Sequence, residues 1–199
     1  MINKAIKSLN YVLFLKDVYL VKHNKSVWHY SMALAKTLNL PDNFLKIISH
    51  ASLFHDIGKI GVPNSILFKP KQLTLKEWQI MKLHSVTGAE LLSNENIEVG
   101  KAVRWHHERW DGTGYPDRLS EENIPLPARI IAVADAYDAL TTDRPYRSAK
   151  SKQEAVIEIT KFSGTHFDPH VVEVFLKIVP DFNCHPISFE PIKTMKGGR

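Results

Sequence analysis

The chain has 199 residues, of which 44% are apolar and 24% charged, with a formal net charge of +5 and a pI near 9.2. This composition is typical of one globular domain and excludes a disordered chain or a transmembrane bundle. The basic residues are spread along the sequence and form no arginine-rich or lysine-rich tract, so the charge favours anionic partners without indicating nucleic acid.

A single cysteine, Cys184, leaves no internal disulfide and is typical of a reducing compartment. The longest early apolar run, residues 11–15, is far shorter than a bilayer span, and no cleavage site of small residues follows it. We therefore expect a cytoplasmic protein without a membrane span.

Apolar residues recur at intervals of three and four along nearly the whole chain, whereas the alternation typical of strands is hard to find. The sequences TLKE at 74–77 and SKQE at 151–154 are capping boxes that mark two helix starts. In chain order, the predicted helices cover residues 2–20, 24–39, 41–54, 74–92, 96–107, 127–142, a segment from 151 and a last helix from the cap at 168 to 178, with a loop over 108–126.

This pattern predicts an all-α protein, a helical bundle of about seven to eight helices. Residues 1–22 are expected to form an N-terminal helix that is either the end of a signalling helix or a cover for the core. Residues 23–180 are expected to form the domain itself, and residues 181–199 a peripheral tail.

Several histidines and aspartates end or interrupt the apolar faces of these helices. His84 and His106 each follow apolar residues at offsets of three and four, so both should point inward. Asp135 lies inside an apolar helix, where an unpaired carboxylate is costly and needs a cation or donors. The residues that share such positions are His23, His55, Asp56, His84, His106, His107 and Asp135.

A buried histidine, taken alone, is more often hydrogen-bonded core than a ligand. Seven polar groups facing one interior would destabilise one another unless a cation joined them. No cysteine is among them, so imidazole with carboxylate favours a catalytic centre of iron, manganese, zinc or nickel over structural zinc. Adjacent side chains diverge by about 100° on a helix, so pairs such as His106-His107 can serve two ions about 3.5–4 Å apart, with open positions for water and phosphate.

The motifs HDIGK at 55–59, HH at 106–107 and GYP at 114–116 closely resemble the HD-GYP domain, a branch of the HD phosphohydrolase superfamily. The likeness extends through KLHSVTGAELL, HHERWDGTGYP, IPLPARIIAVADAYDALTTDRPYR and GTHFDP, from about residue 20 to 180. The resemblance implies a bacterial signalling enzyme that hydrolyses cyclic di-GMP to pGpG and, in many members, GMP. It also implies an HD-domain helical bundle with a metal centre in the core, usually iron or manganese.

The ligands of the family fall on the seven residues above, with Asp56 as the bridging carboxylate. Lys59, one turn after His55, could meet a substrate phosphate, and the phosphate-binding basic positions of the family fall on Arg144 and Arg147. Tyr115 could stack on guanine or pack under its loop. We assign the GYP loop to shaping the site and to docking partners, with diguanylate cyclase domains as the expected partner.

Two departures from the family pattern lie on the first helix. Members with three metals carry a glutamate one turn before the first histidine ligand, where this chain has Tyr19, so we expect two ions. Ser26 stands where arginine is usual, which weakens the assignment of His23. The expected reaction is attack on phosphorus by a hydroxide bridging two metals held by His55, Asp56 and the other ligands, with Lys59 stabilising charge.

Three alternatives stay open. The chain could hydrolyse another cyclic dinucleotide or a nucleotide, could bind cyclic di-GMP or dock a cyclase without hydrolysis, or could bind RNA through its basic charge. The histidines outside the predicted site are interpreted as structural or exposed, and they are His29, His50, His166, His170 and His185.

Overall fold

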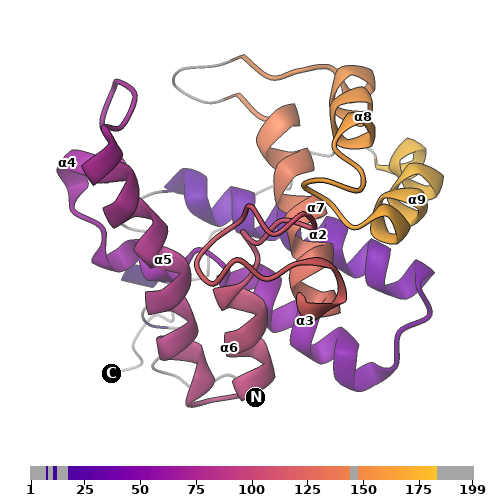
Figure 1. Ribbon diagram of the computed structural model, residues 1–199, viewed down its shortest axis with the longest axis horizontal. Helices are drawn as coiled ribbons and strands as arrows, with labels where there is room; N and C mark the ends of the chain where they lie inside the picture. The colour runs from indigo at the N-terminus through magenta and orange to yellow at the C-terminus, as the bar shows by residue number, and fades with distance from the viewer. Residues whose placement is uncertain (1–7, 9–10, 13–17, 144–147, 183–199) are drawn as a thin grey trace, which may run out of the picture.

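The computed structural model describes residues 8, 11–12, 18–143 and 148–182, and every regular element among them is a helix (Figure 1). The α-helices are α2 Val18–Thr37, α3 Asp42–Phe54, α4 Asn64–Leu67, α5 Leu75–Ser93, α6 Ile97–Arg104, α7 Leu126–Thr141, α8 Lys152–Lys161 and α9 Pro169–Ile178. Three short 3-10 helices complete them: η1 Ile57–Gly61, η2 Glu121–Asn123 and η3 Val179–Asp181. The predicted all-α fold is confirmed.

Two of the predicted helix ends are wrong. The expected break between residues 20 and 24 is absent, because α2 runs without interruption from Val18 to Thr37 and contains His23. That segment holds no glycine or proline, and its polar residues His23 and Asn24 are buried against other helices, so polarity there marks a contact and not a helix end. The helix expected over 96–107 ends at Arg104, which leaves His106 and His107 in the turn that follows.

The predicted helix starts at the two capping boxes are confirmed. The Thr74 hydroxyl accepts a hydrogen bond from the amide of Glu77 at 3.3 Å, while the Glu77 carboxylate accepts one from the amide of Thr74 at 2.7 Å. Ser151 and Glu154 repeat this exchange at the start of α8. Asp168 caps α9 as expected, so the ends of these helices are fixed by local sequence.

Helix α7 contributes residues to both hydrophobic clusters of the core. Its residues Ile130, Val133 and Tyr137 pack in one cluster with α2, α8 and α9, and Ile131 and Ala134 pack in the other with α2, α3 and α6. In Figure 1, α7 accordingly lies in the middle of the molecule, with α8 and α9 on one side and α5 and α6 on the other. Polar side chains carried by α7 therefore face neighbours from several helices at once.

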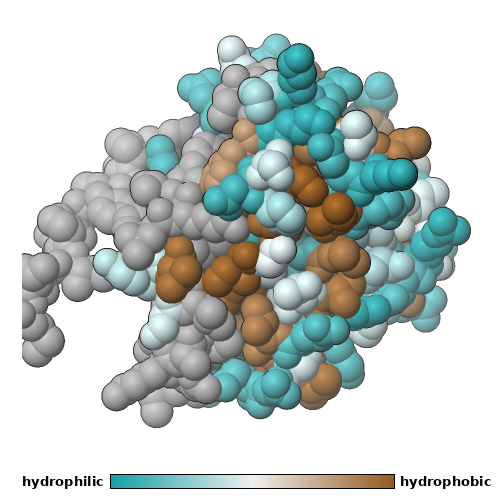
Figure 2. All heavy atoms as spheres, turned by 90° about the vertical axis from the view of Figure 1, so that its left-hand side faces the viewer, coloured by the Kyte–Doolittle hydropathy of each residue, from teal (hydrophilic) through white to brown (hydrophobic). Residues whose placement is uncertain are grey.

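Helix α5 has one side on the core and one exposed side. Its exposed side carries large apolar residues, with Leu75 85%, Leu83 56% and Trp78 43% exposed. Apolar side chains are interspersed with polar ones on the face that Figure 2 shows, which is the side of the molecule on which α4 and α5 lie in Figure 1. None of the helices in the described part of the chain is long and apolar enough to cross a bilayer.

Candidate metal centre

The seven residues predicted as ligands lie together at the centre of the bundle. His23 comes from α2, His84 from α5 and Asp135 from α7, while the two adjacent pairs stand at helix ends. His55 and Asp56 join α3 to η1, and His106 and His107 follow α6. The most enclosed of the seven are at most 6% exposed, and they are His23, His55, Asp56, His84 and His106. The structure thus gathers side chains from five separate segments.

The ligand atoms fall into three overlapping groups within which all atoms lie within 4.8 Å of one another. One group is His84, His106 and His107, and a second is His23, His55 and Asp135. These two groups share no residue. The third group, His55, Asp56 and His106, takes one histidine from each and adds a carboxylate between them. The three groups could therefore hold cations at neighbouring positions, with the carboxylate of Asp56 between them.

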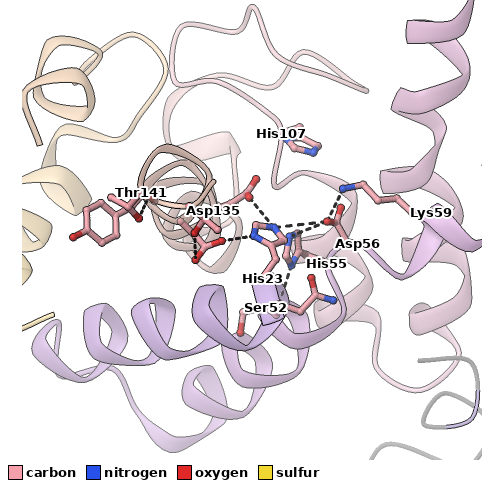
Figure 3. Close-up of polar contacts among 12 residues, drawn as sticks. His23, Ser52, His55, Asp56, Lys59, His107, Asp135 and Thr141 are labelled. Carbon is pink, nitrogen blue, oxygen red and sulfur yellow. Dashed lines mark hydrogen bonds and ion pairs between the residues drawn. The ribbon is translucent and has the colours of Figure 1, made fainter. Parts of the chain in front are cut away.

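The carboxylate of Asp56 contacts histidines of both groups, and Figure 3 shows it beside His23 and His55. Its Oδ2 atom is 3.5 Å from Nε2 of His55 and 3.8 Å from Nε2 of His23, while its Oδ1 atom is 3.5 Å from Nε2 of His84. Each oxygen therefore faces a different side of the cluster, as a bridging carboxylate requires. Oδ2 also accepts a hydrogen bond from Lys59 Nζ at 2.6 Å.

Three of the histidines have their ring orientation fixed by the same local contact. In His55, His84 and His106, Nδ1 lies 2.6–2.8 Å from the backbone carbonyl oxygen three residues earlier. A carbonyl oxygen only accepts, so Nδ1 carries the proton and Nε2 presents a lone pair. Among the described residues, Nε2 of His55 and Nε2 of His106 are buried without a hydrogen-bond partner. Such atoms are costly unless a cation binds them, so the donor set fits divalent metal ions.

His23 lies between two carboxylates of α7. Its Nε2 atom is 3.2 Å from Oδ1 of Asp135 (Figure 3). Its Nδ1 atom is 2.6 Å from Oδ2 of Asp138. Asp138 was not among the predicted ligands. The sequence did hold two signals for it, since it follows Asp135 by about one helical turn and interrupts the same apolar helix; the structure buries it to 3% exposure.

The pKa of His23 is shifted in the opposite direction from the pKa values of the other four histidines of the cluster. Burial lowers the pKa of His107 to about 3, with His84 adding to the shift, and burial also lowers the pKa values of His55, His84 and His106. These rings are neutral at pH 7, as metal ligands must be. Burial would also lower the pKa of His23, but its two carboxylate neighbours raise it to about 9.

The carboxylates of the cluster stay ionised. Burial would raise the pKa of Asp56, but Lys59 and the nearby imidazoles, His55 first, hold it well below its ordinary value. Burial acts likewise on Asp135, and the hydrogen bond from His23 overcomes it and lowers the pKa of that carboxyl. Two negative charges, the buried one of Asp56 and the partly exposed one of Asp135, therefore lie among imidazoles of which only that of His23 has a raised pKa, and the cluster favours positive charge.

Lys59 and Asp135 are the more exposed members of the site. The Lys59 side chain is 23% exposed and the Asp135 side chain 19%, and His107 is also half-buried. Figure 3 shows Lys59 and Asp135 on opposite flanks of Asp56 and His23. The cluster is therefore partly exposed at Lys59, Asp135 and His107, and the ammonium of Lys59 is paired there with the carboxylate of Asp56.

The loop that carries the GYP motif packs directly on the cluster. The Tyr115 ring lies 4.8 Å from the His107 ring, centroid to centroid. A Cβ atom on Gly114 would lie 2.4 Å from Cα of Glu108 and from the amide nitrogen of Arg109, so only glycine fits there. The Glu108 carboxylate accepts a hydrogen bond from the amide of Asp117 at 2.7 Å and thereby holds the far side of the loop.

The remaining predicted residues fall in two classes. Arg144 and Arg147 lie outside the described residues, as does the side chain of Tyr19. Trp110 packs over the guanidinium of Arg129, 5.7 Å from the ring centre, so it belongs to the loop's packing. His166 stacks on Phe162 at 4.2 Å, in agreement with the structural interpretation of that histidine.

Solved structures of known proteins share this fold. An HDGYP protein of Bdellovibrio bacteriovorus superposes with a TM-score of 0.65 at 22% identity, covering 79% of this chain and 51% of that one. In sequence, residues 7–171 match the HD domain family. The chain therefore belongs to the HD domain family, and its resemblance to the HD-GYP branch is confirmed by the relatives described next.

A cyclic di-GMP phosphodiesterase of Thermotoga maritima is 40% identical over 179 residues, covering 88% of this chain and 49% of that protein. A cyclic di-GMP phosphodiesterase response regulator of Xanthomonas campestris is 44% identical over 153 residues, with coverage of 75% and 40%. A 3'3'-cGAMP-specific phosphodiesterase of Vibrio cholerae is 38% identical over 164 residues, with coverage of 80% and 31%. The chain spans less than half the length of each of these relatives.

Proposed function

We propose that this chain is a metal-dependent phosphodiesterase that hydrolyses cyclic di-GMP to pGpG and onward to GMP. One observation carries the proposal: the Nε2 atoms of His55 and His106 are buried without a partner and face the carboxylate of Asp56 inside a cluster of seven ligand-type side chains. A protein that only needed a stable core would not bury these atoms unpaired. The similarity to cyclic di-GMP phosphodiesterases supports the substrate.

The proposed cofactor is a pair of divalent ions, iron or manganese. The two separate groups of ligand atoms and the carboxylate between them support two ions. Imidazole mixed with carboxylate, without cysteine, supports these metals. When bound, the ions would supply Lewis acidity to phosphoryl oxygens and lower the pKa of water to near neutrality.

The side chains around the cluster have separate proposed tasks. Lys59 places an ammonium at the partly exposed side, where it would balance charge on a non-bridging phosphate oxygen during the reaction. Arg144 and Arg147, just after α7, are proposed to bind the second phosphate of a cyclic dinucleotide. Tyr115, fixed over His107, is proposed to limit how the substrate approaches and to offer its ring to a base.

The base specificity has a second candidate. Metal ions and Lys59 recognise phosphate and not guanine, and a relative named for 3'3'-cGAMP is 38% identical to this chain. Hydrolysis of cyclic GMP-AMP is therefore the alternative, and parallel turnover measurements with both dinucleotides distinguish the two. We further propose a cytoplasmic site of action. We also propose that a diguanylate cyclase domain docks at the GYP loop, where residues of α5, residues 112–116 and Arg118 line a hollow of about 530 Å³. A pull-down with an isolated cyclase domain, wild type against Tyr115→Ala, tests the docking.

The decisive experiment is anaerobic purification, metal analysis and a cyclic di-GMP hydrolysis assay of wild type, His55→Ala and His170→Ala. His170 is 68% exposed and lies far from the cluster in sequence and contacts, so it is the matched control. We expect metal and turnover in wild type and His170→Ala, and loss of both in His55→Ala. A His55→Ala variant that loses its metal yet cleaves as fast as wild type would refute the proposed function.

A further inference from the structure

Nδ1 of His23 has a different kind of partner from Nδ1 of three other histidines of the cluster. Nδ1 of His55, His84 and His106 contacts a backbone carbonyl of its own segment. Nδ1 of His23 instead lies 2.6 Å from a carboxylate oxygen of Asp138, 115 residues away on α7. This contact is buried, since His23 is 6% and Asp138 3% exposed.

Asp135 and Asp138 bracket the imidazole of His23. They stand three residues apart on the inward face of α7, and each faces one ring nitrogen. The carboxylate of Asp138 only accepts, so it holds a proton on Nδ1 and leaves Nε2, which donates to Asp135 here, as the ring nitrogen that would bind a metal ion. Asp138 itself belongs to none of the three groups of ligand atoms.

A charged acceptor affects a ligand histidine more strongly than a carbonyl does. A carboxylate bonded to the distal N–H fixes the ring orientation and increases the electron density at the ligating nitrogen. Nδ1 of His84, also inside a helix, contacts the carbonyl of Met81 in its own helix, whereas Nδ1 of His23 contacts Asp138, so the orientation of the His23 ring depends on that carboxylate. Among the described residues, Asp138 also contacts Thr142 Oγ1, but that distance of 3.5 Å is at the limit of hydrogen bonding, whereas the contact with His23 is 2.6 Å long.

We propose that Asp138 is a positioning residue of the metal centre, which orients and activates His23 for metal binding without ligating the metal itself. This inference rests on the proposed function, because it requires that the cluster binds divalent ions. It assigns a role to a residue that the ligand set leaves out.

The test measures binding of Mn²⁺ alone to the metal-depleted chain, from the free-ion EPR signal. Asp138→Asn keeps the shape and an acceptor oxygen but removes the charge, and we expect an affinity about tenfold weaker than wild type. Asp138→Ala removes the acceptor, and we expect a loss of about 100-fold. Asp168→Asn is the control, since Asp168 is an equally buried carboxylate, 4% exposed, that pairs with Arg129 away from the cluster.

A double-mutant cycle separates this role from a merely structural one. If Asp138 acts through His23, then Asp138→Asn should not weaken Mn²⁺ binding further in a His23→Ala background, whereas a structural defect would add to it. Circular dichroism and thermal unfolding check that each variant is folded. Wild-type affinity in both Asp138 variants, or additive losses in the cycle, would overturn the inference while leaving the metal centre in place. A wild-type chain that binds neither Mn²⁺ nor, under anaerobic conditions, Fe²⁺ would overturn the proposed function and this inference together.

Discussion

Nε2 of His84 lies 3.2 Å from Nε2 of His107, although the two residues are 23 positions apart. Nδ1 of His84 donates its proton in a hydrogen bond to the carbonyl of Met81, so Nε2 of His84 presents a lone pair toward His107. With His106, these residues form one of the two separate ligand groups. The other group does not depend on His107.

Because the two ligand groups share no residue, removing a ligand from one group should lower the metal content without emptying the other group. His107→Ala should reduce the metal content from about two ions to about one per chain, because only its own group loses a ligand. Elemental analysis after dialysis against a weak chelator measures the ratio, with His170→Ala as the control. An unchanged ratio of two would show that His107 is not a ligand.

Lys59 offers a test of charge stabilisation apart from metal binding. Lys59→Met keeps the length of the side chain and removes its charge, so turnover of cyclic di-GMP should fall about 10²–10³-fold while the metal content stays the same. Lys46→Met, at an exposed position on α3, is the control and should retain wild-type turnover. Equal turnover in the two variants would remove Lys59 from the proposed mechanism.

The glycine of the HDIGK motif is required by packing. A Cβ atom on Gly58 would lie 1.9 Å from the carbonyl oxygen of His84 and 2.6 Å from the amide nitrogen of Gly88, so η1 would have to move away from α5. Gly58→Ala should lower the free energy of unfolding by about 1–3 kcal/mol and weaken Mn²⁺ binding, because Asp56 moves with η1.

Gly61 is the matched control in the same 3-10 helix. A Cβ atom there meets nothing closer than Thr87 Cγ2 at 3.9 Å. Urea unfolding and Mn²⁺ titration of Gly58→Ala and Gly61→Ala make the comparison. Two variants of equal stability would contradict the requirement for close approach at residue 58.

The GYP loop depends on the buried carboxylate of Glu108. Glu108→Ala leaves the amide of Asp117 without its partner, which should cost about 1–3 kcal/mol of stability and speed amide hydrogen exchange over residues 112–119. Glu122→Ala, exposed in η2 of the same loop, should change stability by less than about 0.5 kcal/mol. Unchanged exchange in Glu108→Ala would show that other contacts, such as that of Arg104 with Asp117, suffice.

The lowered pKa of Glu77, a residue outside the cluster, predicts that the stability of the fold depends on pH. Hydrogen bonds from Lys69 and Thr74 lower the pKa of this carboxyl to about 2 in the folded chain, compared with 4.5 ordinarily. A lowered folded pKa stabilises the fold fully above the ordinary value, and the contribution is lost as the pH falls toward about 2. The stability difference between wild type and Glu77→Gln should therefore narrow from about pH 5 to about pH 3. A difference that stays constant over this range would contradict the assignment.

The sequence by itself determined the helical class, the helix starts and the set of ligand candidates. Capping boxes act within four residues, and helical periodicity is a local property, so Thr74, Ser151 and Asp168 mark helix starts without tertiary information. The cost of burying polar groups selected residues such as Asp135 within an apolar helix. The motifs around His55 and Tyr115 indicated the family.

Only the tertiary structure decided how these residues meet. Whether the polar stretch around His23 breaks a helix depends on what packs against it, and α7 supplies Asp135 and Asp138 there. The role of Asp138 and the close approach of Gly58 to His84 likewise arise between segments far apart in the chain. Such contacts have no local signature, because their energy belongs to pairs of groups that become neighbours only when the helices pack.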